Sequence, residues 1–246
     1  MIAQDERANV NGAGVPRYQM APARLRRGAA MDPVFVTGST GYIGRAMIDA
    51  LRDREYIVHA LVRPCSEAKL PSGVVRVIGD ALDASTFSGA IPVDATLVHL
   101  VGTPQPSPAK AAEFRSVDLA SIRATVAAAR RAGARHLIYV SVAHPAPMMR
   151  SYIAARQEGE SLVKMSGIPA TILRPWYVLG PGHRWPYLLV PIYAALRWLP
   201  ATRDGAERLG LVTRREMIAA LVRAISTPPA QGVRIVEVPE IRQAAA

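Results

Sequence analysis

A glycine-rich turn between an apolar strand and a helix constrains the fold of this chain more than any other feature. Residues 37–44 read TGSTGYIG, follow the apolar residues 34–36 and open a helical pattern over 42–52. Gly38 allows a tight turn, Gly41 lets a pyrophosphate approach the backbone, and Gly44 lets helix and strand pack closely. Free amides at the helix start favour phosphate groups. We therefore expect these residues to bind a dinucleotide, rather than to form an ordinary turn: Gly38, Ser39, Thr40, Gly41, Tyr42 and Ile43.

Strands and helices alternate from residue 33 onward. Apolar runs predict strands over 34–36, 56–62, 74–78, 95–101, 135–142, 170–173 and 233–238. Helical spacing predicts helices over 42–52, 111–132, 148–165, 187–198 and 214–226. Continuous apolar strands indicate a parallel sheet that helices cover on both faces. The predicted fold class is α/β, a doubly wound parallel sheet (Rossmann fold), in which residues 176–246 contribute a small substrate-side lobe.

The composition fits one folded domain preceded by a tail. The chain has 246 residues and is 50% hydrophobic, which is enough to bury a sizeable core. Residues 1–31 carry no apolar period, so we expect a disordered tail, with a transit peptide or a misassigned start codon as alternatives. Residues 32–246 then form the dinucleotide-binding domain. A single cysteine, Cys65, excludes a disulfide framework within the monomer and a cysteine-based zinc site.

The net charge of +11 is a weak guide to partners. Arginine supplies nearly all of it, the basic residues are scattered, and no basic run is interleaved with aromatics. We therefore predict no nucleic-acid partner, and a small molecule as substrate. We also predict no metal. No apolar stretch is long enough for a transmembrane segment. We expect a cytoplasmic protein, and the sequence leaves a homodimer or a subunit of a larger complex open.

The end of the second predicted strand indicates which cofactor binds. An acidic residue about 20 positions after the glycines would bind the ribose 2′-hydroxyl of NAD(H). This chain has Arg63 there, and a guanidinium suits a 2′-phosphate, so NADP(H) is favoured over NAD(H). Alternatively, Arg63 is a solvated arginine in an arginine-rich chain. Four residues at the ends of the third and fourth strands also belong to the predicted cofactor site: Asp80, Ala81, Val101 and Gly102.

Several short motifs, in this order and spacing, resemble the short-chain dehydrogenase/reductase superfamily. The resemblance is carried by residues 37–44, Leu61-Val62-Arg63, Gly79-Asp80, residues 98–102, Tyr139-Val140-Ser141 and Leu173-Arg174-Pro175. More narrowly, the chain is similar to the atypical and extended branches, which include epimerase-like and NmrA-like proteins and the Rossmann accessory subunit of respiratory complex I. The resemblance covers residues 33–240 and implies that Pro175 lies beside the nicotinamide.

The resemblance also implies a catalytic set, which this chain alters. Ser141 takes the position of the family's serine and Tyr152 that of the proton-transferring tyrosine. The family's lysine is replaced by Arg156, which keeps the charge but cannot shuttle a proton. The family's asparagine is replaced by Asp118. The expected function is an oxidoreductase or epimerase-like reaction on a small carbonyl or alcohol. The alternative is a non-catalytic dinucleotide-binding sensor or structural subunit.

Overall fold

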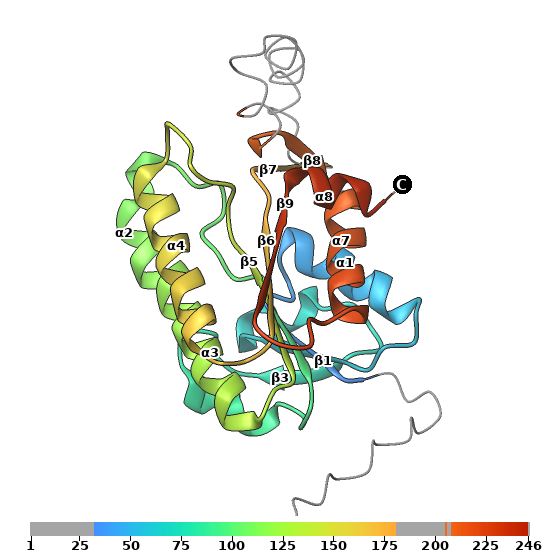
Figure 1. The fold of residues 1–246 in the computed structure, drawn as a ribbon. Helices are drawn as coiled ribbons and strands as arrows, with labels where there is room; N and C mark the ends of the chain where they lie inside the picture. Colours follow the sequence, from blue (N-terminus) through green and yellow to red (C-terminus); the bar gives the residue numbers. More distant parts are fainter. Residues whose placement is uncertain (1–31, 181–204, 206–207, 246) are drawn as a thin grey trace, which may run out of the picture. The chain divides into compact units, whose positions relative to one another are not determined.

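A seven-stranded parallel sheet forms the centre of the domain (Figure 1). The computed structural model describes residues 32–180, 205 and 208–245. The strand order is β3-β2-β1-β4-β5-β6-β9, and every neighbouring pair is parallel. The strands are β1 (Val34–Thr37), β2 (Val58–Val62), β3 (Val75–Ile78), β4 (Thr96–His99), β5 (His136–Val140), β6 (Ala170–Arg174) and β9 (Val233–Glu237). This order confirms the predicted doubly wound Rossmann fold.

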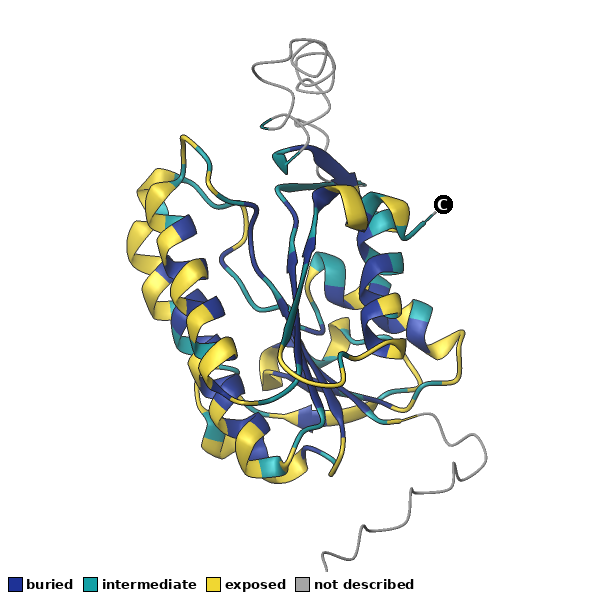
Figure 2. Ribbon diagram, in the orientation of Figure 1, coloured by how far each residue is buried: buried dark blue, intermediate teal, exposed yellow. Residues whose placement is uncertain are grey.

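Helices cover both faces of the sheet, as Figure 1 shows. One face carries α1 (Tyr42–Arg52), α7 (Arg214–Ser226) and α8 (Val238–Gln243). The other face carries α3 (Ala120–Ala132) and α4 (Arg150–Met165). Short 3₁₀ turns complete the connections: η1 (Pro64–Lys69), η2 (Ala84–Thr86), η3 (Ser88–Ala90) and η4 (Pro108–Lys110). In Figure 2 the buried side of each helix faces the sheet and the exposed side faces outward.

The continuous apolar strands are buried for the reason that the sequence indicated. All four residues of β1 and all four of β4 are buried, because helices pack on both of their faces. On α1, the side chains of Met47, Ile48 and Leu51 are fully buried against the sheet. Each contributes roughly 1.5–3 kcal/mol of apolar transfer free energy. The core therefore fixes α1, and with it the glycine-rich turn that precedes it.

The predicted helix over 111–132 is interrupted in the structure. It consists of α2 (Ala111–Glu113), a π-helical turn η5 (Phe114–Leu119) and α3. A π turn forms i→i+5 hydrogen bonds and inserts one extra residue into the helix, which period-based reading of the sequence cannot detect. It carries Asp118, which is buried at 1% exposure.

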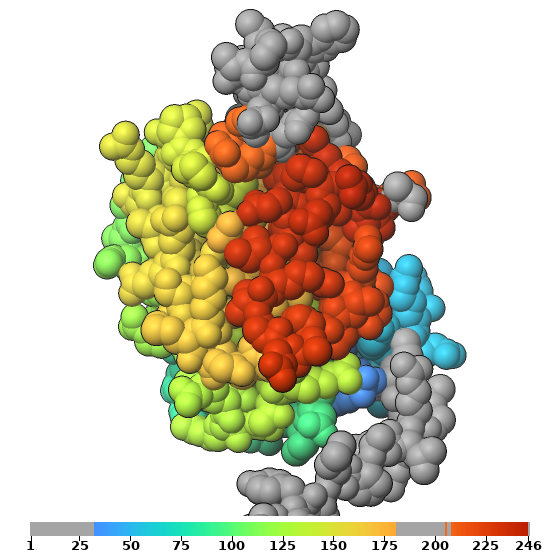
Figure 3. All heavy atoms as spheres, viewed as in Figure 1, coloured from blue at the N-terminus to red at the C-terminus, as the bar shows by residue number. Residues whose placement is uncertain are grey.

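Three short elements were not predicted from the sequence. Strands β7 (Tyr177–Leu179) and β8 (Leu211–Thr213) pair in parallel as a separate two-stranded sheet, and α8 follows β9 directly. Strands of three residues are too short to show a periodic pattern. Figure 3 shows the segment that contains α7, β9 and α8 forming one surface beside α4.

The predicted tail, residues 1–31, and the predicted helix over 187–198 lie outside the described residues. In the described part of the chain, no helix combines the length and apolar composition needed to cross a bilayer.

Candidate cofactor and active site

The glycine-rich turn is so closely packed that two of its glycines have no space for a side chain. Gly38 has a φ of +76°, and a Cβ there would lie 2.7 Å from the carbonyl carbon of Leu100. A Cβ on Gly44 would lie 2.2 Å from the carbonyl oxygen of Gly38. Both contacts are with backbone, which cannot rotate away. The turn therefore approaches β4 and α1 as closely as the sequence motif requires.

Hydrogen bonds of buried polar side chains fix the position of this turn. The Ser39 hydroxyl donates a 2.5 Å hydrogen bond to the Leu61 carbonyl at the end of β2. The Thr37 hydroxyl lies 2.9 Å from Nδ1 of His99, which also lies 2.9 Å from the Thr125 hydroxyl. Burial, together with the charge of Arg156, lowers the pKa of His99 to about 3, so His99 is neutral at pH 7. The shape of the turn is therefore fixed by contacts within the protein.

The first turn of α1 is suited to an anion. Gly41 is the N-cap residue and supplies no side-chain hydrogen bond, and the first turn carries no acidic residue. The amides at a helix start have no acceptor within the helix, and the helix dipole adds a partial positive charge there. The backbone amides of residues 42–44 thus offer hydrogen-bond donors where the motif places the pyrophosphate.

The residues predicted for the adenosine half lie at the ends of β2 and β3. Arg63 is exposed, and in the described part of the chain its side chain makes no ion pair or hydrogen bond. Asp80 is also exposed, and its Oδ1 accepts a 3.0 Å hydrogen bond from the amide of Leu82. Ala81 follows directly. Arg45, one residue beyond the third glycine, lines a cavity of about 440 Å³ together with Lys69 of η1.

Arg156 and Asp118 form a buried ion pair at the ends of β4 and β5. Nη2 of Arg156 lies 2.7 Å from Oδ1 of Asp118, and the side chains are 6% and 0% exposed. Nη1 of Arg156 donates to the Val140 carbonyl at 3.0 Å. A Cβ on Gly102 would lie 2.1 Å from Nη2 of Arg156. The glycine at position 102 therefore leaves room for this guanidinium.

Tyr152 lies beside this ion pair. Its ring packs against Phe114 of η5, with 5.0 Å between the ring centroids. Cζ of Arg156 lies 5.2 Å from the centroid of the same ring. Tyr152 and Arg156 are one helical turn apart on α4, as their spacing predicts. The structure thus brings the predicted tyrosine and the predicted cation together.

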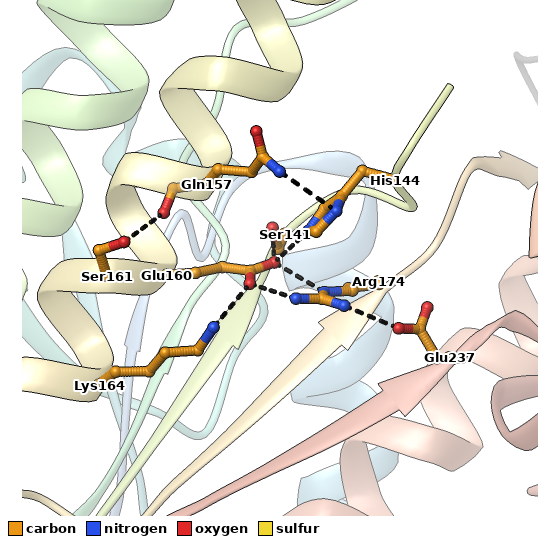
Figure 4. A network of polar contacts seen from close by, with 8 residues as sticks. All are labelled: Ser141, His144, Gln157, Glu160, Ser161, Lys164, Arg174 and Glu237. Atoms are coloured by element: carbon orange, nitrogen blue, oxygen red, sulfur yellow. Dashed lines mark hydrogen bonds and ion pairs between the residues drawn. The ribbon is translucent and has the colours of Figure 1, made fainter. Parts of the chain in front are cut away.

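Ser141 belongs to a second polar network, which is centred on Glu160 (Figure 4). The Ser141 hydroxyl donates to Oε1 of Glu160 at 2.8 Å, and the Glu160 side chain is 2% exposed. Arg174 donates to both carboxylate oxygens, at 2.8 and 2.5 Å, and to Glu237 of β9 at 2.8 Å. Nε2 of His144 lies 3.3 Å from the same Oε1. This network connects α4, β6, β9 and the loop after β5.

Burial and hydrogen bonding act in opposite directions on Glu160. Burial alone would raise the pKa of this carboxyl group. The hydrogen bonds from Arg174 and Ser141, with the positive charge of Arg174, outweigh burial and hold the pKa below its ordinary value. Glu160 is therefore a carboxylate at neutral pH, which allows it to accept a hydrogen bond from the Ser141 hydroxyl.

Comparison with known proteins identifies the family. A family model described as NAD(P)H-binding matches residues 38–184. The chain belongs to this NAD(P)H-binding family. The match begins at Gly38 of the glycine-rich turn and extends past β6, so it spans the expected cofactor turn and both polar networks except Glu237.

Two curated relatives of this NAD(P)H-binding protein are named as reductases. Ceramide reductase of Caulobacter vibrioides is 28% identical over 217 residues, which cover 87% of this chain and 66% of the relative. The 3-diazoavenalumate denitrifying reductase of a Streptomyces species is 32% identical over 178 residues, covering 61% and 57%. The chain thus spans less than two thirds of the length of each of these relatives.

The solved structures that match support the fold. A short-chain dehydrogenase/reductase superfamily protein from Agrobacterium tumefaciens, solved with bound NAD, matches with a TM-score of 0.62 and 21% identity. The match covers 83% of this chain and 77% of that protein. Together with the family match, it confirms an NAD(P)H-binding protein with a Rossmann fold.

Sequence reasoning missed the residue at the centre of the second network. Glu160 lies four residues after Arg156 and eight after Tyr152, so all three share one face of α4. That spacing was a usable signal, because a charged residue on the sheet-facing side of a helix needs a partner.

Proposed function

We propose that this protein is an NADP(H)-dependent oxidoreductase that acts on a small carbonyl compound or on the corresponding alcohol. The observation that carries the proposal is the position of Tyr152 beside the fixed guanidinium of Arg156. Arg156 contacts the carboxyl end of β5, and the glycine-rich turn follows the carboxyl end of β1. The carboxyl ends of parallel strands meet at one edge of the sheet, so both groups lie at that edge. Ligands of this fold bind there, where the strand order reverses between β1 and β4. The reductase names of both curated relatives agree with the proposal.

The residues of the chain divide the work between binding and proton transfer. When bound, a nicotinamide dinucleotide supplies or accepts the hydride. The turn at residues 38–43 would hold its phosphates, and Val101, Gly102 and Pro175 would flank its other half. Tyr152 is the proposed proton donor to the carbonyl oxygen. Arg156 supplies positive charge next to Tyr152 and stays protonated, so it does not relay the proton itself.

Ser141 has a more restricted role in this proposal. A serine hydroxyl carries one proton, and that of Ser141 is used in the hydrogen bond to Glu160. Toward a ligand, its oxygen therefore offers only lone pairs. We propose that Ser141 accepts a hydrogen bond from an N–H or O–H group of the bound ligand.

Substitution of Tyr152 tests the catalytic proposal. Turnover is measured with NADPH and a panel of aldehydes, ketones and quinones, for the wild type and for Tyr152→Phe. We expect the substitution to abolish turnover while the affinity for NADPH stays nearly unchanged, because only the phenolic oxygen is lost. Turnover that survives in Tyr152→Phe would assign the proton to another group. A wild type that binds NADPH and turns over nothing would refute the oxidoreductase proposal.

Substitution of Arg63 tests the cofactor preference. Arg63 is exposed at the end of β2 and is free of partners in the described part of the chain, so its charge is available to a 2′-phosphate. A charge-assisted hydrogen bond contributes about 1.5–3 kcal/mol, so Arg63→Ala should weaken NADPH binding roughly ten- to a hundredfold. NADH binding should stay unchanged, which fluorescence titration measures. Equal affinity of the wild type for both cofactors would refute the preference.

A further inference from the structure

We infer that Asp118 and Arg156 act as one charge-neutral unit that positions Tyr152, so that Asp118 is a positioning residue of the reaction. The inference rests on the oxidoreductase function proposed above. It concerns two positions at which the chain departs from the residues expected by family resemblance. The aspartate at position 118 and the arginine at position 156 are explained together if the charge of each neutralises the charge of the other.

The burial of the pair makes each charge depend on the other. The two side chains are 6% and 0% exposed and lie 2.7 Å apart. The second carboxylate oxygen of Asp118 accepts hydrogen bonds from the amide and the hydroxyl of Thr103, at 3.0 and 2.6 Å. A buried guanidinium without a counter-charge is strongly unfavourable, as is a buried carboxylate without a donor. Neither charge can therefore be removed alone without leaving the other buried and uncompensated.

The pair connects the elements that surround the proposed active site. Arg156 lies on α4, and Asp118 lies on the π-helical turn η5. Arg156 also donates to the carbonyl of Val140, the last residue of β5, at 3.0 Å, and to that of Val101, beyond the end of β4, at 3.5 Å. A Cβ on Gly102 would collide with this guanidinium. One planar side chain thus fixes the relative positions of two strand ends and two helical segments.

Tyr152 contacts Arg156 directly and contacts the element that carries Asp118 through Phe114. Its ring packs against Phe114, which lies on η5 four residues before Asp118, and Cζ of Arg156 lies 5.2 Å from the ring centroid. A shift of η5 relative to α4 would therefore move the tyrosine. Misplacement of a reacting group by about 1 Å can cost about a hundredfold in rate. The ion pair acts on the reaction through this placement, without touching the substrate.

A lysine at position 156 cannot reproduce this geometry by itself. The guanidinium is a planar fork with five donors, which lets it reach a carboxylate and two carbonyls at once. A lysine ammonium is a compact charge that would leave some of these acceptors unpaired. With a neutral amide at position 118, the buried carboxylate that needs the fork is gone. The substitution Arg156→Lys should therefore be tolerated better in the Asp118→Asn background than in the wild type.

A double-mutant cycle tests the inference. The four proteins are the wild type, Asp118→Asn, Arg156→Lys and the double variant, and kcat, KM, the Kd for NADPH and the melting temperature are measured for each. Asp118→Asn should lower kcat about a hundredfold and change the Kd for NADPH less than about threefold. Its melting temperature should fall by about 10 °C. In the double variant, kcat should be at least about tenfold above the product of the two single effects.

A matched control uses an exposed ion pair that also involves α4. Arg123 and Glu158 lie 3.6 Å apart, with side chains 62% and 44% exposed. The cycle with Arg123→Lys and Glu158→Gln should show additive, small effects on kcat and on melting. Comparable coupling in the two cycles would overturn the inference, because it would show that burial is not the cause.

The outcomes separate this inference from the proposed function. Additive effects of Asp118→Asn and Arg156→Lys on both kcat and melting would overturn the unit. A lower melting temperature with unchanged kcat at 20 °C would overturn the positioning role. If Asp118→Asn does not fold, Thr103→Val removes one donor to Asp118 and should lower kcat about tenfold; an unchanged kcat there would equally overturn it. A wild type that binds NADPH without turnover refutes the proposed function and, with it, the positioning role. In that case the melting temperatures decide whether the pair is a unit: non-additive effects of Asp118→Asn and Arg156→Lys support it, and additive effects overturn it.

Discussion

The substitution Glu160→Gln should destabilise the protein far more than the same substitution at Glu158, two residues away on α4. Glu160 is 2% exposed and accepts hydrogen bonds from Ser141 and from Nε and Nη2 of Arg174. Glutamine has nearly the same shape but no charge, so Arg174 would lose its buried counter-ion. Removing one partner of a buried pair costs about 3–5 kcal/mol. Because Arg174 keeps its contact with Glu237, we expect a loss of about 3 kcal/mol.

Glu158 provides the matched control. Its side chain is 44% exposed and lies 3.7 and 3.6 Å from the guanidinium groups of Arg115 and Arg123. Solvent screens such pairs, so Glu158→Gln should cost less than about 1 kcal/mol. Urea unfolding at pH 7, followed by circular dichroism, measures both free energies of unfolding. The melting temperature of Glu160→Gln should fall by roughly 6–12 °C.

The pH dependence provides an independent check on the same carboxylate. The pKa of Glu160 is lowered in the folded protein. A carboxyl group with a lowered folded-state pKa contributes stability that is fully present above its unfolded pKa, about 4.3, and that is lost as the pH falls through the folded pKa. The difference in unfolding free energy between the wild type and Glu160→Gln should therefore be constant near neutrality and shrink below about pH 4. A loss in Glu160→Gln no larger than that of the Glu158 control would refute the reasoning.

Two further predictions concern the glycine-rich turn and its anchor. Gly44→Ala should destabilise the fold and weaken NADPH binding more than about tenfold, because its Cβ would lie 2.2 Å from the Gly38 carbonyl oxygen. Gly89→Ala, where a Cβ meets nothing within 4 Å, is the control and should bind NADPH like the wild type. His99 has a folded pKa of about 3, so below its unfolded pKa of about 6.5 only the unfolded chain takes up its proton. The contribution of His99 to stability should then fall by about 1.4 kcal/mol per pH unit as the pH drops from 6.5 toward 3, and His99→Gln should reduce the measured slope by that amount; an unchanged slope would contradict the assignment.

The sequence by itself determined the fold class and the position of the cofactor turn. Both rest on local features: the glycines at 38, 41 and 44 follow an apolar strand directly, and the helix that they open has the same bounds as predicted, Tyr42–Arg52. The φ of +76° at Gly38 depends on that one residue being glycine. The burial of β1 on both faces is indicated by its continuous run of apolar residues. Local causes of this kind leave a signal at the residues themselves.

Only the tertiary structure decided which charged groups meet. The sequence indicated that positions 118 and 156 were both altered, but not that they pair, because 38 residues and one strand separate them. Their contact depends on the π turn and on the strand order, which place η5 against α4. In the same way, Glu160 meets Arg174 and Ser141 because β5 and β6 are neighbours beneath α4. Ion pairs across elements depend on the packing register of those elements, and no periodicity in the chain encodes that register.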